Sequence, residues 1–399
     1  MLVRYAKRLI SGVAAGLYLV VLFTLLPDRA NSSPATTPLR EGLWRKGTKL
    51  GTTPGSILSS LNSLTNAKLA SEPDDLFIAT CLSRTLDAQS LRIPATPETR
   101  PFSMMNTIVM TGGTSGLGEV AARRFIETPN TRLLLGARRR GPLGAETLPL
   151  DLMRLENVRS FASAVDRELG PAQINSLVLN AGLLFPNDDT RSADGFEAAF
   201  AVNHLAHYLL LRLLLPRLAQ GATVILTTSG THDPAEKTII APPLHADARF
   251  LAHPERDPHP LIAGGRTYSS SKLCNVLTAR ALAAHSDTTA RHLTIIAYDP
   301  GHTPGTGLVR NGNFVINFLW KPLAPALRLM LRGSNTPEAA GHALAKLALG
   351  QIRPPSGRIY AALRSGIITW PDPSELARRD DVRDALWRDS GAMVGLPEG

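Results

Sequence analysis

The chain has 399 residues, 44% hydrophobic and 19% charged, which favours a globular protein with a sizeable core, as one large domain with extensions or as two domains. Its two cysteines, Cys81 and Cys274, exclude a disulfide framework and a cysteine-based metal cluster. The net charge of +10 suits an anionic cofactor or lipid, but no stretch interleaves basic and aromatic residues, which argues against a nucleic-acid partner.

The N-terminus carries a membrane signal. Residues 9–26 form an uncharged apolar run of eighteen residues, which can just span a hydrocarbon core of about 30 Å as a helix. A cleaved signal peptide is the alternative, but no clean Ala-x-Ala site follows, so residues 1–29 are predicted to be an uncleaved single-pass anchor. Basic residues on both sides leave its orientation open. The membrane would be the endoplasmic reticulum in a eukaryote.

Residues 30–104 are expected to be a juxtamembrane extension with no chemistry of its own. Residues 31–38 are a turn-rich linker, and residues 57–69 could form a short amphipathic helix. Pro94, Pro97 and Pro101 end this region in another loop. The main domain is therefore assigned to residues 105–399.

Apolar runs and helical patterns alternate along this domain. Strands are predicted at 106–110, 132–136, 147–151, 176–180, 222–227 and 292–297, and helices at 119–126, 158–169, 201–218 and 269–285. Several strands are continuous apolar runs, as in a parallel sheet covered on both faces. The alternation predicts a doubly wound, Rossmann-type α/β fold.

A glycine-rich turn, residues 111–118, separates the first strand from the first helix. Glycines there let the backbone approach a pyrophosphate, whose charge the helix N-terminus favours. The spacing is Gly112-x-x-x-Gly116-x-Gly118 rather than Gly-x-Gly-x-x-Gly, so a purely structural turn is the alternative.

Tyr268 and Lys272 stand four residues apart on a predicted helix and therefore share a face. A free phenol has a pKa near ~10, and a nearby cation lowers it. The pair predicts Tyr268 as proton donor and acceptor, with Lys272 as the group that tunes it. Taken alone, such a pair could equally be solvated helix surface.

Together, several motifs resemble those of the short-chain dehydrogenase/reductase family, in the same order, from about residue 105 to about 365. They are Thr111-Gly112-x-x-x-Gly116-Leu-Gly118, Asn180-Ala-Gly182, Ser229, Tyr268-x-x-x-Lys272 and Pro300-Gly301. Five further stretches resemble the retinol dehydrogenase and protochlorophyllide reductase branches: residues 203–207, 271–275, 306–308, 373–377 and 387–396.

The resemblance implies a catalytic role for four residues. Ser229 would hydrogen-bond the substrate oxygen. Ser229 and His232 match the Ser-x-x-His pattern of the retinol dehydrogenase branch, which favours Ser229 over Thr227 and Thr228. Tyr268 would transfer the proton, and Lys272 would also hold the nicotinamide ribose. Asn203 would position a water behind Lys272 for proton relay.

The cofactor prediction depends on charge. NAD-dependent relatives carry an acid at the end of the second strand, whereas this strand is followed by Arg138 and Arg139. A guanidinium can pair with a 2′-phosphate, so NADP(H) is predicted, with Arg138 the main contact; a basic surface turn is the alternative. The expected cofactor-binding residues are Gly112, Thr114, Ser115, Gly116, Leu117, Gly118, Arg138, Arg139, Asp151, Leu152, Asn180, Ala181, Gly182, Tyr268, Lys272, Pro300, Gly301 and Thr303.

The chain departs from the family pattern in three places, one of them Ala206, where many relatives have Gly. Gly305 stands where relatives often have a carboxamide-binding threonine, so Thr303 or Thr306 would substitute. The interval from Ser229 to Tyr268 is 268 − 229 = 39 residues, longer than usual. It contains His245, His253 and His259, but their spacing matches no metal pattern, so no metal site is predicted and a substrate-lining loop is preferred.

A second apolar stretch, residues 314–331, falls where the family covers its substrate. With the N-terminal anchor, it suggests a lipophilic substrate. The sequence therefore predicts a membrane-anchored, NADP(H)-dependent oxidoreductase acting on a carbonyl or alcohol, with a homodimer possible. Light-driven C=C reduction and a non-catalytic dinucleotide-binding scaffold are the alternatives.

Overall fold

The structure is a computed structural model that describes residues 105–397, except residues 186, 237, 239, 260–264 and 304–333. The predicted anchor, the extension at 30–104 and the apolar stretch at 314–331 lie outside the described residues. Within the described part of the chain, the predicted Rossmann-type parallel sheet is confirmed.

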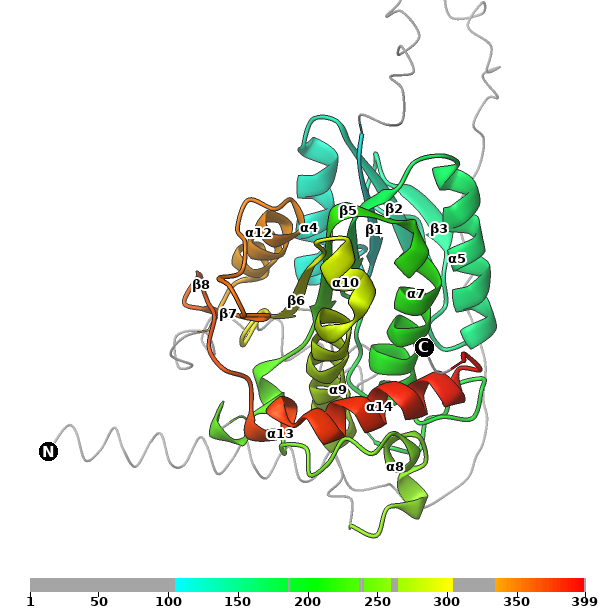
Figure 1. The fold of residues 1–399 in the computed structure, drawn as a ribbon, viewed down its shortest axis with the longest axis vertical. Coiled ribbons are helices and arrows are strands. Elements are labelled where there is room, and N and C mark those ends of the chain that lie inside the picture. The colour runs from blue at the N-terminus through cyan, green and yellow to red at the C-terminus, as the bar shows by residue number, and fades with distance from the viewer. Residues whose placement is uncertain are drawn as a thin grey trace, which may run out of the picture. The chain divides into compact units, whose positions relative to one another are not determined.

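The sheet runs in the order β3-β2-β1-β4-β5-β6-β7-β8 (Figure 1). Its strands are β1 (Asn106–Thr111), β2 (Thr131–Ala137), β3 (Glu146–Pro149), β4 (Ile174–Leu179), β5 (Leu218–Thr227), β6 (Thr294–Asp299), β7 (Tyr360–Arg364) and β8 (Ile367–Thr369). β1 to β7 pair in parallel, and β8 returns antiparallel to β7. Because β1 lies between β2 and β4, the chain reverses its direction across the sheet there, and such switch points are where dinucleotides bind.

Helices cover both faces of this sheet (Figure 1). α5 (Leu155–Leu169), α7 (Ala206–Leu214) and α9 (Arg266–Ala284) pack their apolar side chains into one core cluster. α4 (Gly116–Glu127) and α12 (Pro337–Ala348) pack into the cluster on the other face. Strands with apolar residues on both sides, such as β1 and β4, are buried by this double cover.

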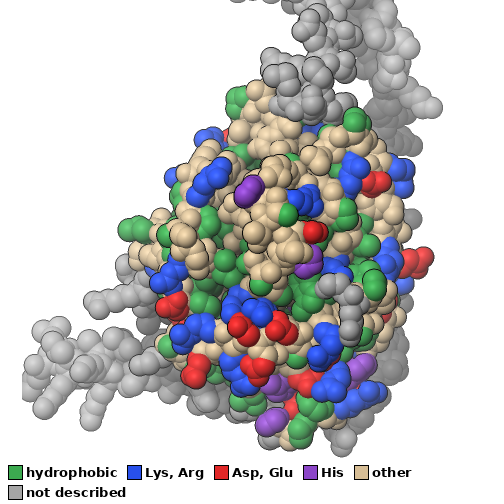
Figure 2. All heavy atoms as spheres, in the orientation of Figure 1, with side chains coloured by type: hydrophobic (Ala, Val, Ile, Leu, Met, Phe, Trp, Pro, Cys, Tyr) green, Lys and Arg blue, Asp and Glu red, His purple; other side chains and the backbone are tan. Residues whose placement is uncertain are grey.

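The last described helices cross the layer formed by α5, α7 and α9. α13 (Glu375–Arg378) and α14 (Asp380–Met393) run across α9, and α14 also meets α7 and α8 (Ala248–Ala252) (Figure 1). The Tyr208 hydroxyl donates to the Trp387 carbonyl at 2.9 Å, and the two rings meet edge to face. Figure 2 shows acidic and basic side chains side by side over α14, where Arg383 pairs with Asp380 and Asp384.

The helix predicted at 201–218 differs in detail. It begins as α6 (Ala198–Phe200), widens into a π-turn at Ala201–Leu205, continues as α7 and ends in a 3₁₀ turn, so β5 already starts at Leu218. Of the described helices, the run Ala198–Arg217 is long and apolar enough to cross a membrane, but it is 89% buried in the protein. It is therefore a core helix, because a helix that is buried on all sides is also apolar on all sides.

Candidate active site

The predicted site residues all follow the carboxyl ends of strands or lie on the helices beside them. The glycine turn follows β1, Arg138 and Arg139 follow β2, Asp151 and Leu152 follow β3, Asn180 to Gly182 follow β4, Ser229 follows β5, and Pro300 to Thr303 follow β6. Parallel strands bring their carboxyl ends to one edge of the sheet, which is where open α/β folds bind their ligands. The fold thus gathers residues that are spread over nearly 200 positions.

The glycine turn fits a dinucleotide pyrophosphate. Gly112 and Gly116 have φ angles of 72° and 57°, which favour glycine. A Cβ on Gly118 would lie 2.0 Å from the Gly112 carbonyl oxygen, so the turn folds tightly onto the start of α4. α4 begins at Gly116 after the extended Ser115, so the free N–H groups of its first turn face this edge. Thr114 and Leu117 are half-buried in the same turn.

Asn180 fastens the glycine turn to the neighbouring strands. Its side-chain amide donates to the Gly112 carbonyl at 3.1 Å and accepts from the Thr227 hydroxyl at 3.1 Å. The backbone N–H groups of Asn180 and Ala181 both donate to the Thr111 hydroxyl, at 3.0 and 3.1 Å. Asn180 therefore has a structural role in addition to its predicted position on the adenosine side.

The predicted adenosine end is more open. Arg138 and Arg139 are exposed directly after β2, and the Asp151 carboxylate accepts from the backbone N–H of Met153 at 3.1 Å. Leu152 packs against the core cluster beneath α5. The two guanidinium groups are thus accessible to solvent at this edge.

Tyr268 lies in the first turns of α9 and is only 6% exposed. Burial raises the pKa of its phenol, a hydrogen bond with Ser229 lowers it, and the charge of Asp299 raises it further. The lowering of this pKa by Lys272 stays a prediction: the Lys272 ammonium lies 5.6 Å from the Tyr268 ring centroid, and burial is the largest influence on the phenol. The Tyr268 phenol is accordingly protonated at neutral pH.

Ser229 caps the 3₁₀ turn at Gly230–His232, where its hydroxyl accepts from the Thr231 N–H at 3.3 Å. His232, the residue that singled out Ser229, contacts the Ser229 carbonyl oxygen through Nδ1 at 2.7 Å. The His232 ring also meets the Tyr360 ring edge to face. Serine and histidine thus fix each other's position beside Tyr268.

Lys272 is buried one helical turn after Tyr268. Its ammonium donates to the Thr227 carbonyl at 3.1 Å, and burial lowers its pKa to about 8 although Asp299 opposes the shift. Gly182 lies against it, since a Cβ there would sit 3.1 Å from Nζ and 3.4 Å from Asn203 Oδ1. Gly182 therefore leaves the space in which Lys272 and Asn203 approach each other.

Asn203 lies in the π-turn before α7, a distortion often found at functional sites. Its amide accepts from the Leu183 N–H at 2.8 Å and donates to the Leu183 carbonyl at 2.9 Å. It also donates to the Ser271 hydroxyl at 3.0 Å. Asn203 is thus fixed next to Lys272, and it holds the loop after β4 in place.

Two polar residues at this edge had no role in the sequence analysis. His207 joins Thr111 to the carbonyl of Asn203, at 2.9 and 3.2 Å, and burial lowers its pKa to about 4, so it is neutral. Asp299 ends β6 and is 1% exposed; its carboxylate accepts from the Gly301 N–H at 2.9 Å. The sequence signal that could have identified Asp299 is an acidic residue at the end of an otherwise apolar strand.

The turn after β6 is held from both sides. Thr303 donates to the carbonyls of Pro300 and Gly301, at 3.2 and 3.1 Å. Asn335 donates to the Pro300 carbonyl at 2.9 Å. Thr306 and Gly305, the other residues of the predicted carboxamide contact, lie outside the described residues.

Comparison with known proteins identifies the family. The short chain dehydrogenase family model matches residues 106–238. Retinol dehydrogenase 12 of Bos taurus is 30% identical over 304 residues, covering 72% of this chain and 86% of the relative. The chain belongs to the short-chain dehydrogenase family.

Other relatives place this short-chain dehydrogenase in the predicted branch. Protochlorophyllide reductase B of Oryza sativa subsp. japonica is 29% identical over 335 residues, which are 76% of this chain and 81% of the relative. The solved structure of an uncharacterised Mycobacterium paratuberculosis protein superposes with a TM-score of 0.53 at 24% identity, over 73% of this chain and 94% of that one, and supports the fold. The short-chain dehydrogenase is therefore an oxidoreductase, and its family supports a nicotinamide dinucleotide as cofactor.

Proposed function

We propose that this short-chain dehydrogenase is an NADP(H)-dependent oxidoreductase that acts on a carbonyl or alcohol group of a lipophilic substrate. One observation carries the proposal: Tyr268, Ser229, Lys272 and Asn203 converge at the carboxyl edge of the sheet, beside a glycine turn that fits a pyrophosphate. A scaffold without chemistry has no need of a buried phenol and ammonium, whose desolvation is costly.

In this proposal each residue has a distinct task. The glycine turn and the start of α4 hold the pyrophosphate, and Lys272 holds the nicotinamide ribose. The bound dinucleotide supplies or takes up the hydride. Ser229 and Tyr268 hold the substrate oxygen, and the Tyr268 hydroxyl gives up its proton as negative charge develops there. Lys272 and Asn203 favour the return of a proton to the phenolate.

NADP(H) is proposed over NAD(H) because Arg138 and Arg139 are exposed after β2, where an acid would be needed to grip a ribose 2′-hydroxyl. Two guanidinium groups there favour a 2′-phosphate.

A lipophilic substrate is proposed from two features. The relative retinol dehydrogenase 12 acts, by its name, on an apolar alcohol. The apolar runs at residues 9–26 and 314–331 would bring the enzyme to a membrane and cover the substrate. We extend the proposal to the single-pass anchor at 1–29, the linker at 30–104, the catalytic domain at 105–399 and a possible homodimer.

The test is a screen of lipophilic and small soluble aldehydes and ketones with NADPH, wild type beside Tyr268→Phe. The phenylalanine keeps the ring and removes the proton, so kcat should fall by about 10²–10⁴-fold while NADPH affinity is kept. Tyr208→Phe is the matched control, because among the described residues that hydroxyl bonds Trp387 and Arg212, and its loss should leave kcat unchanged. Equal turnover in wild type and Tyr268→Phe would reject the proposed role.

The relationship to protochlorophyllide reductases favours a second candidate, reduction of a C=C bond. Here Tyr268 would deliver its proton to carbon instead of oxygen. The same assay with a tetrapyrrole, run in light and in darkness, separates the two: turnover only under illumination supports the second candidate.

A further inference from the structure

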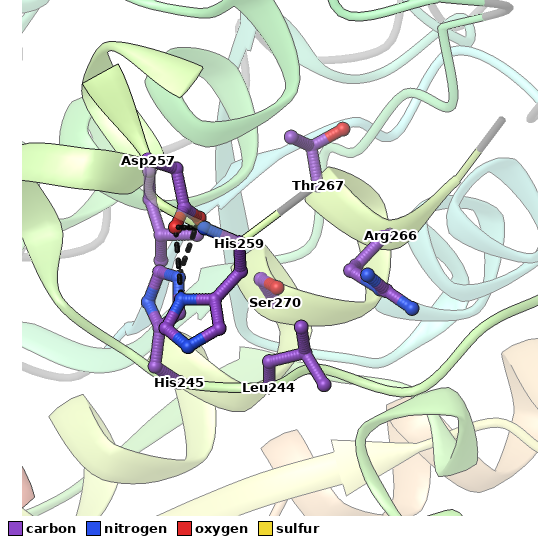
Figure 3. A pocket seen from close by; sticks show the side chains of 8 residues that line it. Leu244, His245, Asp257, His259, Arg266, Thr267 and Ser270 are labelled. Atoms are coloured by element: carbon purple, nitrogen blue, oxygen red, sulfur yellow. Dashed lines mark hydrogen bonds and ion pairs between the residues drawn. The ribbon is translucent and has the colours of Figure 1, made fainter. Parts of the chain in front are cut away.

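Three side chains in the long segment between Ser229 and Tyr268, those of His245, Asp257 and His259, point toward one another (Figure 3). His245 Nε2 lies 2.7 Å from one carboxylate oxygen of Asp257, and His259 Nδ1 lies 3.1 Å from the other. The three ligand atoms all lie within 4.8 Å of one another. The sequence analysis predicted no metal site because the spacing matches no pattern; the fold brings the residues together through a bend that spacing does not encode.

We propose that His245, Asp257 and His259 bind a divalent transition-metal ion, with Zn²⁺ the best match. Two imidazole nitrogens and one carboxylate oxygen are ligands that zinc accepts, whereas Mg²⁺ prefers oxygen alone. Bonds of about 2.0–2.2 Å in tetrahedral geometry separate neighbouring ligand atoms by roughly 3.3 Å. The His–Asp distances of 2.7 and 3.1 Å therefore have to open slightly to admit the ion, while all three ligand atoms already lie within 4.8 Å of one another.

The surroundings of the three ligands determine how an ion enters. The Asp257 side chain is 5% exposed, and its position is fixed by the His259 N–H at 2.9 Å. The His259 side chain is 60% exposed and leaves a path from solvent. His245 Nδ1 accepts from the Asp247 N–H at 3.2 Å, so Nε2 holds the proton that the ion must replace. When the ion binds Nε2, this proton moves to Nδ1, and the contact with the Asp247 N–H is given up.

With three protein ligands, the fourth position of a tetrahedral ion would be taken by water. Its pocket is also lined by Thr267 and Ser270 of α9, so an ion there would join the segment 245–259 to the start of that helix. Ser270 comes two residues after Tyr268, about 200° further around the helix, so the pocket lies on the side away from the phenol. The ion would fix the approach to α9 without touching the reacting groups.

The experiment measures metal binding and needs no activity. The full chain, without a polyhistidine tag, is stripped with EDTA and titrated with ZnSO₄ by calorimetry, with metal content measured after dialysis. We expect one ion per chain for the wild type and for His253→Ala, a control from the same segment. Affinity should fall by more than about tenfold in His259→Ala and Asp257→Asn, because even the loss of an outer partner costs about 10–100-fold.

His259→Ala is expected to fold like the wild type, because the side chain that it removes is largely exposed. In EDTA its Tm should equal that of the wild type, and only the wild type should gain Tm when Zn²⁺ is added. The proposal is overturned if the wild type takes up no stoichiometric zinc. It is also overturned if His259→Ala and the double variant His245→Ala/His259→Ala bind zinc as tightly as the wild type does. Neither result depends on the oxidoreductase function.

Discussion

The Arg364 guanidinium donates a 2.8 Å hydrogen bond to the carboxylate of Asp299, directly before the Pro300–Gly301 turn. The same oxygen accepts from the Tyr360 hydroxyl at 3.1 Å, and Arg364 also pairs with Glu236 beyond β5. The buried carboxylate thus joins β6 to β7 and to the segment after Ser229. Because it lies at the active-site edge, its charge also acts on Tyr268 and Lys272.

Replacing Asp299 by asparagine should shift the pH profile of kcat toward lower pH. The negative charge of Asp299 raises the pKa of both Tyr268 and Lys272, so removing it lowers both. We expect a shift on the order of 0.5–1 pH unit. Asp233→Asn is the control, since that carboxylate caps the nearby Ala235 N–H instead. Profiles that coincide for wild type and Asp299→Asn would show that Asp299 is only structural.

Arg138→Ala should raise the KM for NADPH by about 10–100-fold, the loss of one charge-assisted phosphate contact of about 1.5–3 kcal/mol. The KM for NADH should change little, because NADH has no 2′-phosphate. Arg140→Ala, in the same exposed triplet, serves as the control and should resemble the wild type. An unchanged ratio of the two KM values in Arg138→Ala would contradict the assignment.

Gly118→Ala should abolish tight dinucleotide binding. The added Cβ would meet the Gly112 carbonyl oxygen at 2.0 Å and the Asn180 amide at 2.6 Å, so the turn must open. Overpacking of this kind costs about 1–3 kcal/mol of stability. Cofactor affinity by fluorescence titration and the free energy of unfolding check both effects. Glu119→Ala, which loses only an exposed ion pair to Arg123, should bind cofactor normally.

Glu197 should make stability depend on pH between about 4.5 and 7. Its buried carboxylate accepts from the Ala199 and Phe200 N–H groups, but burial raises its pKa from 4.5 to about 7. Over this range the folded state keeps a proton that the unfolded chain has lost, so its contribution is present below pH 4.5 and is lost as pH rises through 7.

Glu197→Gln removes this titration. From pH 4.5 to 7.5 the wild type should lose up to about 3 kcal/mol of unfolding free energy relative to the variant, measured by urea denaturation. Parallel stability curves for the two proteins would rule out the buried charge as the cause.

The sequence predicted the architecture where its signals were local. The apolar runs that became β1, β2 and β4 and the glycine turn were recognisable because strand burial and backbone freedom depend on neighbouring residues. The short strands β7 and β8 were missed, because β7 gains its stability from pairing with β6, far away in the chain, and β8 in turn pairs with β7.

The candidate site was predictable in its residues but less so in its electrostatics. Tyr268 and Lys272 lie together as their spacing implied, yet the direction of the phenol pKa depends on burial that a helix pattern does not reveal. The π-turn that positions Asn203 was not predicted, because its sequence has the pattern of an ordinary α-helix. Asp299 was given no role from the sequence, because its partner Arg364 lies 65 residues away.

The placement of α14 has a consequence for biosynthesis. It lies across α9, Ser390 contacts His204 at 2.9 Å, and Arg159 donates to the Val394 carbonyl, so the last helix closes the layer formed by much earlier ones. On the ribosome, α5, α7 and α9 are made long before this cover exists. Their apolar faces can be covered by α14 only once residue 394 has left the exit tunnel. The final folding step of this enzyme is therefore expected after translation of the domain, when its last helix closes over the helices made first.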